Sequence, residues 1–356
     1  MMFQSIRDTL PQSRILRGLL AVIVVSLLLA PFIFDGSRAL DTAARLCIFI
    51  VLVASYDLLL GYTGVVSFAH TLFFGIGAYS VAIAFDHVAP GFGVLLVAVV
   101  VALGVSTVVA VTIGLVSLRV KAIFYAMITL AVASVATVLV SQLYLYTGGE
   151  DGMTYRIPRV LTPAFKLLDD KVLGVRINGK LLNYYLIFTV STVLFLLMVR
   201  IVASPFGKVL KALRENDFRA EAIGYTTVYY RTAATVISAC MATLAGVLMA
   251  IWLRYTGPDS VLSLNIMIDI LLMVVIGGMG SLYGAIIGAT LLVLARNYLN
   301  EAMGVAHNAF IDVPILAELF NPERWLLWLG VLFVVMVYFF PLGIVGRLVR
   351  GRADHG

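Results

Sequence analysis

The chain has 356 residues, of which 62% are hydrophobic and only 12% are charged. Soluble domains carry about 25% charged residues, so this composition excludes an ordinary soluble protein and predicts an all-α, polytopic membrane protein. The net charge of +6 is better explained by Lys and Arg in cytoplasmic loops than by nucleic-acid binding. Cys47 and Cys240 both lie in apolar runs, so no disulfide framework or Cys-based metal site is expected.

Apolar runs follow one another along almost the whole chain. A membrane-crossing helix needs roughly 17–25 mainly apolar residues. The candidate runs are 18–34, 44–60, 65–85, 92–118, 122–146, 181–199, 232–253, 261–277, 280–299 and 325–346. The sequence therefore predicts one transmembrane domain over 1–356, built as a helical bundle of about ten spans.

The distribution of Lys and Arg favours both termini in the cytoplasm and the polar loop 147–180 on the outside. This loop begins Thr147-Gly148-Gly149-Glu150-Asp151-Gly152, a turn-rich sequence that we expect to cap the bundle. Further along, the dipeptide Asn178-Gly179 predicts the turn of a small hairpin, because it supplies the positive φ angles of a type I′ turn.

A basic, polar stretch at 205–224 separates two apolar runs. It is rich in helix formers and ends at Gly224, which predicts a short helix lying at the membrane surface. Two interpretations of this stretch are open. Either a soluble partner docks on it, or it is an ordinary positive loop that only determines topology.

Glycines concentrate in two stretches, Gly61-Tyr62-Thr63-Gly64 and Gly277-Gly278-Met279-Gly280. With the apolar residues before them, the two align at an offset of 216 residues and predict a parallel internal repeat. Glycine-interrupted segments at corresponding places in two halves indicate a transport pathway. Gly280, Gly284 and Gly288 also share one helix face, which allows another helix to approach closely.

Polar residues inside the apolar runs are candidates for function, since a bare charge in lipid is costly. Asp269 lies in the middle of its run and is expected to be paired, protonated or facing a cavity. Asp57 lies near the cytoplasmic end of its run, where it can reach water. His70, with Ser67 nearby, is expected either to line a pore or to be a hydrogen-bonded packing residue.

Motifs of the common enzymes are absent from the sequence. It contains no Gly-x-x-x-x-Gly-Lys-Ser/Thr nucleotide-binding loop, no Gly-x-Ser-x-Gly and no His-Glu-x-x-His. We therefore expect neither an enzyme nor a bound cofactor or metal in this chain. Energy for transport would come from a partner attached at 205–224, whereas a secondary transporter or channel acting alone is the alternative.

Several motifs together resemble the permeases of branched-chain amino-acid ABC importers, specifically the LivM-type subunit. These motifs are Gly61–His70, Phe74–Tyr79, Tyr125–Ala131, Thr147–Gly152, Leu213–Asn216 with Glu221–Gly224, and Val275–Gly284. The resemblance covers roughly residues 45–300. A urea importer permease of the same family is the nearest alternative. The loop departs from the Glu-Ala-Ala-x-x-x-Gly form of many importer permeases, since only Ala220 and Gly224 match it.

The resemblance implies an importer of branched-chain amino acids in a bacterial inner membrane that works by alternating access. It implies as partners a sister permease, two cytosolic ATPases that bind ATP and Mg, and an external solute-binding protein. Residues 205–224 would be the coupling helix, with Arg214, Glu215, Asn216, Ala220, Glu221, Ala222 and Gly224 facing an ATPase. The substrate pathway would include Gly61, Tyr62, Thr63, Gly64, Ser67, His70, Asp269, Gly277, Gly278 and Gly280.

Overall fold

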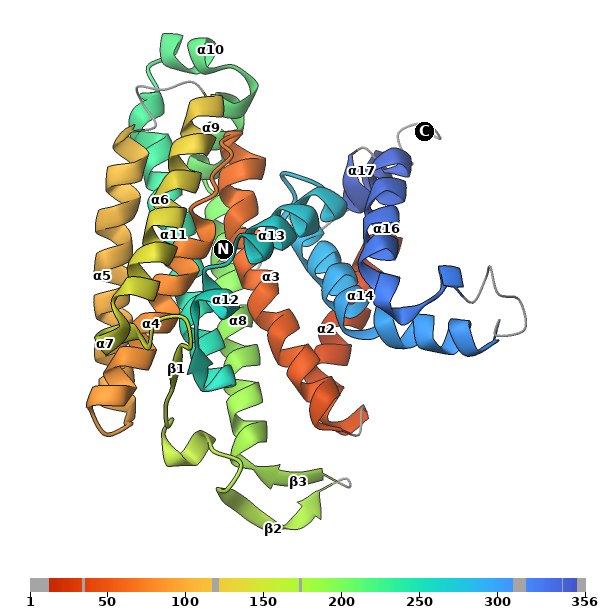
Figure 1. The fold of residues 1–356 in the computed structure, drawn as a ribbon. Coiled ribbons are helices and arrows are strands. Elements are labelled where there is room, and N and C mark those ends of the chain that lie inside the picture. Colours follow the sequence, from red (N-terminus) through yellow and green to blue (C-terminus); the bar gives the residue numbers. More distant parts are fainter. Residues whose placement is uncertain are drawn as a thin grey trace.

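The computed structural model describes residues 13–33, 36–116, 122–172, 175–309, 318–340 and 342–350. Over these residues the chain forms a helical bundle with two small two-stranded sheets (Figure 1). We call the end that carries α9 (Pro205–Glu215) and α10 (Asp217–Ala222) the α10 end, and the end that carries β2 (Lys166–Val172) and β3 (Val175–Asn178) the hairpin end.

The other helices and strands make up the rest of the bundle. In chain order they are α2 (Arg14–Ile33), α3 (Ser37–Thr63), α4 (His70–His87), α5 (Phe92–Val116), α6 (Ala122–Gln142), α7 (Tyr144–Thr147), β1 (Met153–Thr154), the 3₁₀ helix η2 (Arg159–Leu161), α8 (Gly179–Ala203), α11 (Thr227–Leu253), β4 (Tyr255–Thr256), α12 (Pro258–Val261), α13 (Leu264–Gly277), α14 (Leu282–Ala309), the 3₁₀ helix η3 (Pro322–Arg324), α16 (Trp325–Phe339) and α17 (Gly343–Arg350).

Nine helical segments among the described residues are long and apolar enough to cross a membrane, which confirms the predicted polytopic bundle. Each corresponds to one of the expected apolar runs. The remaining run, 65–85, becomes α4, which is 18 residues long and is not among the nine. Its ends, His70 and Asp86-His87, are polar and lower its mean hydropathy.

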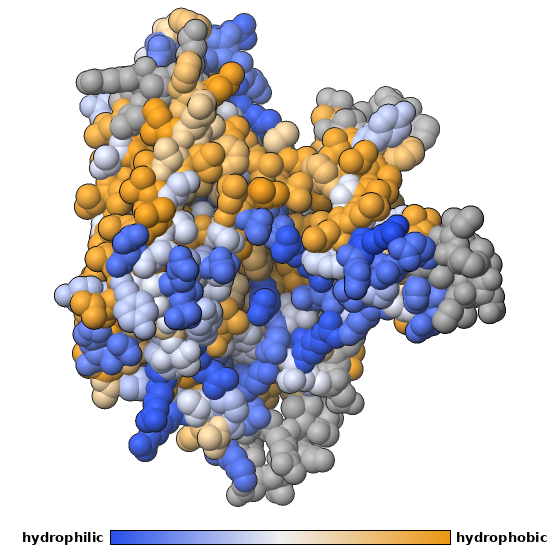
Figure 2. All heavy atoms as spheres, viewed as in Figure 1, coloured by the Kyte–Doolittle hydropathy of each residue, from blue (hydrophilic) through white to orange (hydrophobic). Residues whose placement is uncertain are grey.

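Helix α3 forms the centre of the bundle. Almost every residue from Thr42 to Thr63 is buried, and α3 packs against α8, α11, α13 and α14. By contrast, α5, α6 and α16 leave most of their apolar side chains at least partly exposed. Figure 2 shows an apolar band across the molecule, with polar residues gathered near α10 and toward the hairpin end. This distribution fits a bundle that is surrounded by lipid at mid-height.

Helices α4 and α11 cross at two glycines. A Cβ atom on Gly77 of α4 would overlap the main-chain carbonyl of Thr243, and one on Gly246 of α11 would overlap that of Phe74. Neither position has room for a side chain. Backbone contacts of this kind are typical of helix packing within membranes, where small residues allow the helices to approach.

Helix α4 begins well inside the bundle. His70, its first residue, lies 2.8 Å from the Ser55 hydroxyl, measured from ring nitrogen Nε2. Ser55 precedes the last residue of α3, Thr63, by eight residues, so the chain between the two helices descends about 12 Å. Its non-helical backbone is bonded to protein, since the amide of Phe68 donates to the Thr129 hydroxyl at 3.0 Å. Irregular backbone is tolerated at membrane depth only where protein buries it.

The hairpin end differs from the sequence prediction in one detail. A hairpin is present, but β2 pairs Val172 with Val175 of β3, so its turn does not lie at Asn178-Gly179. Instead, the Asn178 side chain accepts a hydrogen bond from the amide of Leu181 at 3.1 Å and caps α8. The predicted turn was wrong because Asn favours both tight turns and helix N-caps, and local sequence does not distinguish them.

Candidate functional site

The two glycine stretches meet at the α10 end. Asp57 of α3 accepts a hydrogen bond through Oδ1 from the main-chain amide of Gly280, at 2.8 Å. A Cβ atom on Gly61 would overlap both this carboxylate and the Gly280 amide. Asp57 is buried and does not reach water, contrary to the sequence expectation. It joins the end of α3 to the turn between α13 and α14. We call the contact of Asp57, Gly61 and Gly280 the glycine node.

Segment 205–224 is attached directly to the glycine node. The guanidinium of Arg214, near the end of α9, donates a hydrogen bond to the main-chain carbonyl of Gly61. A Cβ atom on Gly280, whose φ is +84°, would lie 2.8 Å from the Arg214 guanidinium and 3.0 Å from that carbonyl. One arginine therefore links α9, the end of α3 and the turn before α14.

Two further contacts join α9 and α17 to the same region. The Lys211 ammonium lies over the ring of Tyr62, 5.2 Å from its centroid. On the other side, a Cβ atom on Gly343 at the start of α17 would overlap Gly278. Gly278 has φ +112°, and a Cβ there would lie 2.9 Å from the carbonyl oxygen of Leu342. The C-terminal helix thus packs on the second glycine stretch.

The predicted single helix over 205–224 is interrupted at Asn216. Helix α9 ends at Glu215, and the Asn216 side chain caps α10 by accepting from the amide of Arg219 at 3.0 Å. Asp217 then forms a two-pronged ion pair with Arg231 of α11, at 2.8 and 2.9 Å. Gly224 has the predicted positive φ, +94°. The sequence analysis missed the cap and the ion pair, although Asn followed by Asp is a common helix start.

The outer face of segment 205–224 is open. Phe218 is 87% exposed and Ile223 is 69% exposed. Glu215, Glu221 and Ala222 are exposed as well. Ala220 differs, since it is buried with Val209 and Leu213 in a small apolar cluster beneath the segment. An exposed aromatic residue among charges is typical of a protein-binding surface.

His70 and Ser67 belong to a separate, buried polar cluster. The Ser55 hydroxyl bonds to the His70 ring and donates to the Leu52 carbonyl at 2.7 Å. The main-chain carbonyl of Ser55 accepts from the Ser238 hydroxyl at 2.6 Å. The ring of Tyr56 lies 5.2 Å from that of His70. Ser67 accepts from the Ala69 amide at 3.3 Å and helps to begin α4. These contacts hold α3, α4 and α11 together.

Asp269 of α13 is paired, as one of the sequence-based alternatives anticipated. Its carboxylate lies 2.8 Å from the guanidinium of Arg296 in α14. The Asp269 side chain is 7% exposed, whereas that of Arg296 is 39% exposed. Helix α14 runs antiparallel to both α13 and α3, as the contacts of Gly288 with Met273 and of Asn297 with Thr42 show. Helices α3 and α13 therefore run in the same direction, as a parallel repeat requires.

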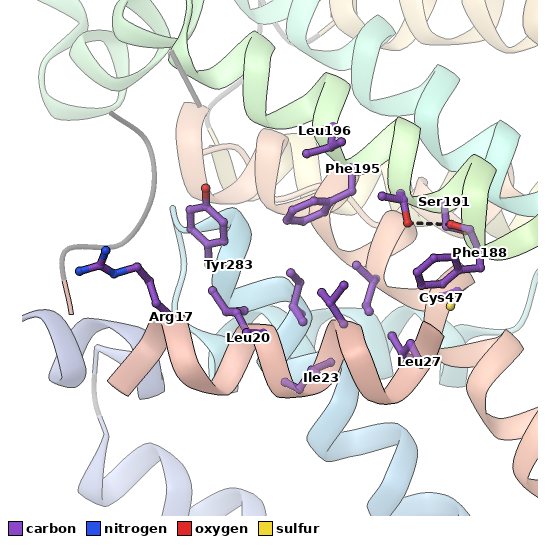
Figure 3. Close-up of a pocket in the computed structure, with 15 residues that line it drawn as sticks. Arg17, Leu20, Ile23, Leu27, Cys47, Phe188, Ser191, Phe195, Leu196 and Tyr283 are labelled. Carbon is purple, nitrogen blue, oxygen red and sulfur yellow. Dashed lines mark hydrogen bonds between the residues drawn. The ribbon is translucent and has the colours of Figure 1, made fainter. Parts of the chain in front are cut away.

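A separate apolar groove of about 450 Å³ lies between α2 and α8. Figure 3 shows Leu20, Ile23 and Leu27 of α2 facing Phe188 and Phe195 of α8, with Arg17 near one end. None of the residues predicted for the substrate pathway lines this groove. Its walls are mainly apolar, so it offers chiefly van der Waals contact, although Ser191 and Thr192 of α8 also line it.

Comparison of the sequence with known proteins places the chain in a family. The chain matches the family described as "Branched-chain amino acid transport system / permease component" over residues 38–338. It is 26% identical over 340 residues to the high-affinity branched-chain amino acid transport system permease protein LivM of Salmonella typhimurium, covering 92% of this chain and 74% of that protein. No solved structure matches it.

Two further relatives carry the same description. The LivM permease protein of Escherichia coli is 25% identical over 318 residues, covering 86% of this chain and 69% of that protein. A probable branched-chain amino acid transport permease protein LivM of Methanocaldococcus jannaschii is 25% identical over 163 residues, 45% of each chain. Because the family match spans most of its length, this chain belongs to the family of branched-chain amino acid transport system permease components.

Proposed function

We propose that this chain is the membrane-spanning permease subunit of an ATP-driven importer of branched-chain amino acids. Family membership supports the substrate class. The observation that carries the ATP-driven part is the bond from Arg214 to Gly61, because it connects an exposed polar segment to the end of the central helix α3. A loop that only determined topology would not need such a connection.

In this proposal, two cytosolic ATPases bind ATP and Mg, and one of them docks on the exposed face of segment 205–224. The residues that face it are Glu215, Glu221, Ala222 and Phe218, with Asn216 and Gly224 shaping the two short helices. Arg214 passes their movement to the glycine node, where Gly61, Gly64, Gly277, Gly278 and Gly280 permit adjustment of the backbone. Ala220 packs against Val209 and Leu213 on the buried side of the segment.

A sister permease completes the pathway, and an external solute-binding protein delivers the amino acid at the hairpin end. The α10 end and both termini then face the cytoplasm of a bacterial cell, with the bundle in its inner membrane. Tyr62, Thr63 and the glycines beside them border the moving region, whereas His70, Ser67 and Asp269 hold the helices that move. The bundle would alternate between outward and inward access.

Reconstitution tests this proposal. The chain, its sister permease, the two ATPases and the solute-binding protein are placed in vesicles with ATP inside the compartment that the ATPases face. We expect labelled leucine to be taken up only with ATP and with all partners present. Uptake without the ATPases, or uptake driven by a proton gradient, would instead make this chain a secondary transporter. Uptake of urea but not leucine would assign it to another substrate.

A further inference from the structure

A polar cavity of about 200 Å³ lies at the hairpin end, away from the glycine node. The first turns of α3 and α8 and the last residues of α11 form its walls, and the loop around η2 covers one side. Its polar lining comes from Asp41, Arg45, Lys180, Asn183 and Arg254, with the Trp252 ring beside them. A space of this size holds one small solute, since sites for drug-sized ligands are roughly 300–1,000 Å³.

The charges in this cavity are not balanced. Asp41 forms an ion pair with Lys180 at 3.0 Å, and the same ammonium lies 5.6 Å from the centroid of the Trp252 ring. The guanidinium groups of Arg45 and Arg254 have no hydrogen bond or ion pair within the part of the chain that the structure describes. Among the described residues, the cavity therefore presents two exposed guanidinium groups without a protein partner beside one ion pair, an arrangement that attracts a carboxylate.

Asn183 supplies an acceptor next to these cations. It is almost fully buried, and its amide nitrogen donates to the Ile251 carbonyl at 3.3 Å. Its Oδ1 atom is also buried and has no hydrogen-bond partner among the described residues. A buried carbonyl without a donor costs free energy. A bound group with N–H donors would satisfy it.

The backbone at Arg254 carries a second unusual feature. Arg254 caps the end of α11 with φ +57°, the only positive value of a non-glycine residue in the described ranges. Glycine is the usual residue at such a cap, because a Cβ atom is unfavourable in this conformation. An arginine at a position that suits glycine points to a role for its side chain in the cavity.

We propose that this cavity binds one aliphatic α-amino acid as a zwitterion. The carboxylate would be held by Arg45 and Arg254, and the ammonium by the Asn183 carbonyl and Asp41. Leu161 and Leu253, which also line the cavity, would contact the hydrocarbon side chain. This inference rests on the proposed function, in which the hairpin end is external, and it makes the cavity the first place where the permease meets its substrate.

The test measures binding of labelled leucine to the full chain in phosphatidylcholine nanodiscs without ATP. We expect Arg45→Gln and Arg254→Gly each to weaken leucine binding about tenfold or more, the range of a lost charge-assisted hydrogen bond. Arg254→Gly also relieves the backbone at the cap, so misfolding would not explain its loss. Arg156→Gln removes an exposed cation from the loop before η2, outside the lining of the cavity, and should leave the affinity unchanged.

Four results would overturn the inference. Leucine could fail to bind the unmodified chain at millimolar concentration, or bind both arginine variants as tightly as the unmodified chain. The zwitterionic headgroup of phosphatidylethanolamine has the same chemistry, so loss of leucine binding in discs of that lipid would identify the headgroup as the occupant. Finally, weaker capture of the solute-binding protein by the variants, with unchanged leucine affinity, would assign the arginines to a protein contact.

The outcome is separable from that of the proposed function. ATP-driven leucine uptake by the reconstituted complex, without leucine binding in the nanodiscs, would overturn the cavity alone. Leucine binding that depends on Arg45 and Arg254, without ATP-driven uptake, would instead overturn the ATP-driven importer and leave the cavity in place.

Discussion

Arg214 on α9 donates a hydrogen bond to the main-chain carbonyl of Gly61, a residue 153 positions earlier in the sequence. Gly61 in turn lies against Asp57, whose carboxylate accepts from the amide of Gly280. Three distant parts of the chain thus share one contact at the α10 end. In the proposed mechanism a displacement of α9 would act on this contact, because Arg214 bonds to the backbone of the central helix.

The bond from Arg214 should be necessary for transport but not for docking of the ATPases. Replacing Arg214 with Met removes the donor and keeps an apolar stem of similar length. We expect the ATPases to co-purify with the variant, while ATP-driven leucine uptake falls by about tenfold or more, as for a lost hydrogen bond to a charged group. Arg200→Gln, which removes an exposed charge at the end of α8, serves as the control. Normal uptake by Arg214→Met would refute the link.

The exposed face of segment 205–224 should be the docking surface itself. Phe218→Asp places a charge where we expect an apolar contact, and Glu221→Lys with Gly224→Val reverses a charge and strains a positive φ by about 1–2 kcal/mol. We expect each change to abolish co-purification of the ATPases without loss of membrane insertion. The control is Leu145→Asp in α7, at an equally exposed residue (87%) outside segment 205–224. This variant should retain the ATPases. Retention of the ATPases by Phe218→Asp would exclude this face.

Topology can be tested by labelling single cysteines in sealed vesicles, after replacement of Cys47 and Cys240. Ile223 and Leu342, at the α10 end, should be labelled only from the cytoplasmic side, and Glu150 only from the external side. All three residues are exposed, so absence of labelling would reflect the membrane rather than burial. Labelling of Ile223 from outside would invert the proposed orientation.

The close approach of α13 and α14 predicts a strong effect at Gly288. An added Cβ would overlap the Met273 carbonyl, so Gly288→Ala should lower the free energy of unfolding by about 1–3 kcal/mol through overpacking. Gly104→Ala is the matched control, because no atom lies within 4 Å of the new Cβ. There the change should be neutral or stabilise helix α5 by up to about 1 kcal/mol. Thermal unfolding in detergent measures the stability of both variants. Equal melting temperatures of Gly288→Ala and Gly104→Ala would contradict the close packing of α13 on α14.

The ion pair between Asp269 and Arg296 should be a packing contact. Asp269→Leu leaves the Arg296 charge without its partner and should destabilise the protein by about 1–3 kcal/mol, less than a fully buried pair because Arg296 is partly exposed. The double variant with Arg296→Met replaces both charges by apolar groups and should recover most of this loss. Thermal unfolding of the single and double variants measures whether the stability is recovered. A double variant as unstable as Asp269→Leu would show that Arg296 serves something other than the pair.

The sequence by itself determined the class of the protein. The long apolar runs, the basic stretch at 205–224 and the family motifs are local features, because a lipid environment requires every spanning segment to be apolar and helical. Gly224 was also identified correctly as a stop, since a positive φ favours glycine wherever the chain must turn.

Only the tertiary structure decided how these parts meet. The bond between Asp57 and Gly280 joins residues 223 positions apart, and no local pattern shows that a carboxylate near a helix end is buried there. The same holds for Arg214 and Gly61, and for Arg45, Asn183 and Arg254, which come from three different helices. Asn178 shows the converse: its propensity allowed both a turn and a helix cap, and packing of the hairpin against α8 selected the cap. Such choices depend on contacts between distant segments, which become fixed only when the helices pack together.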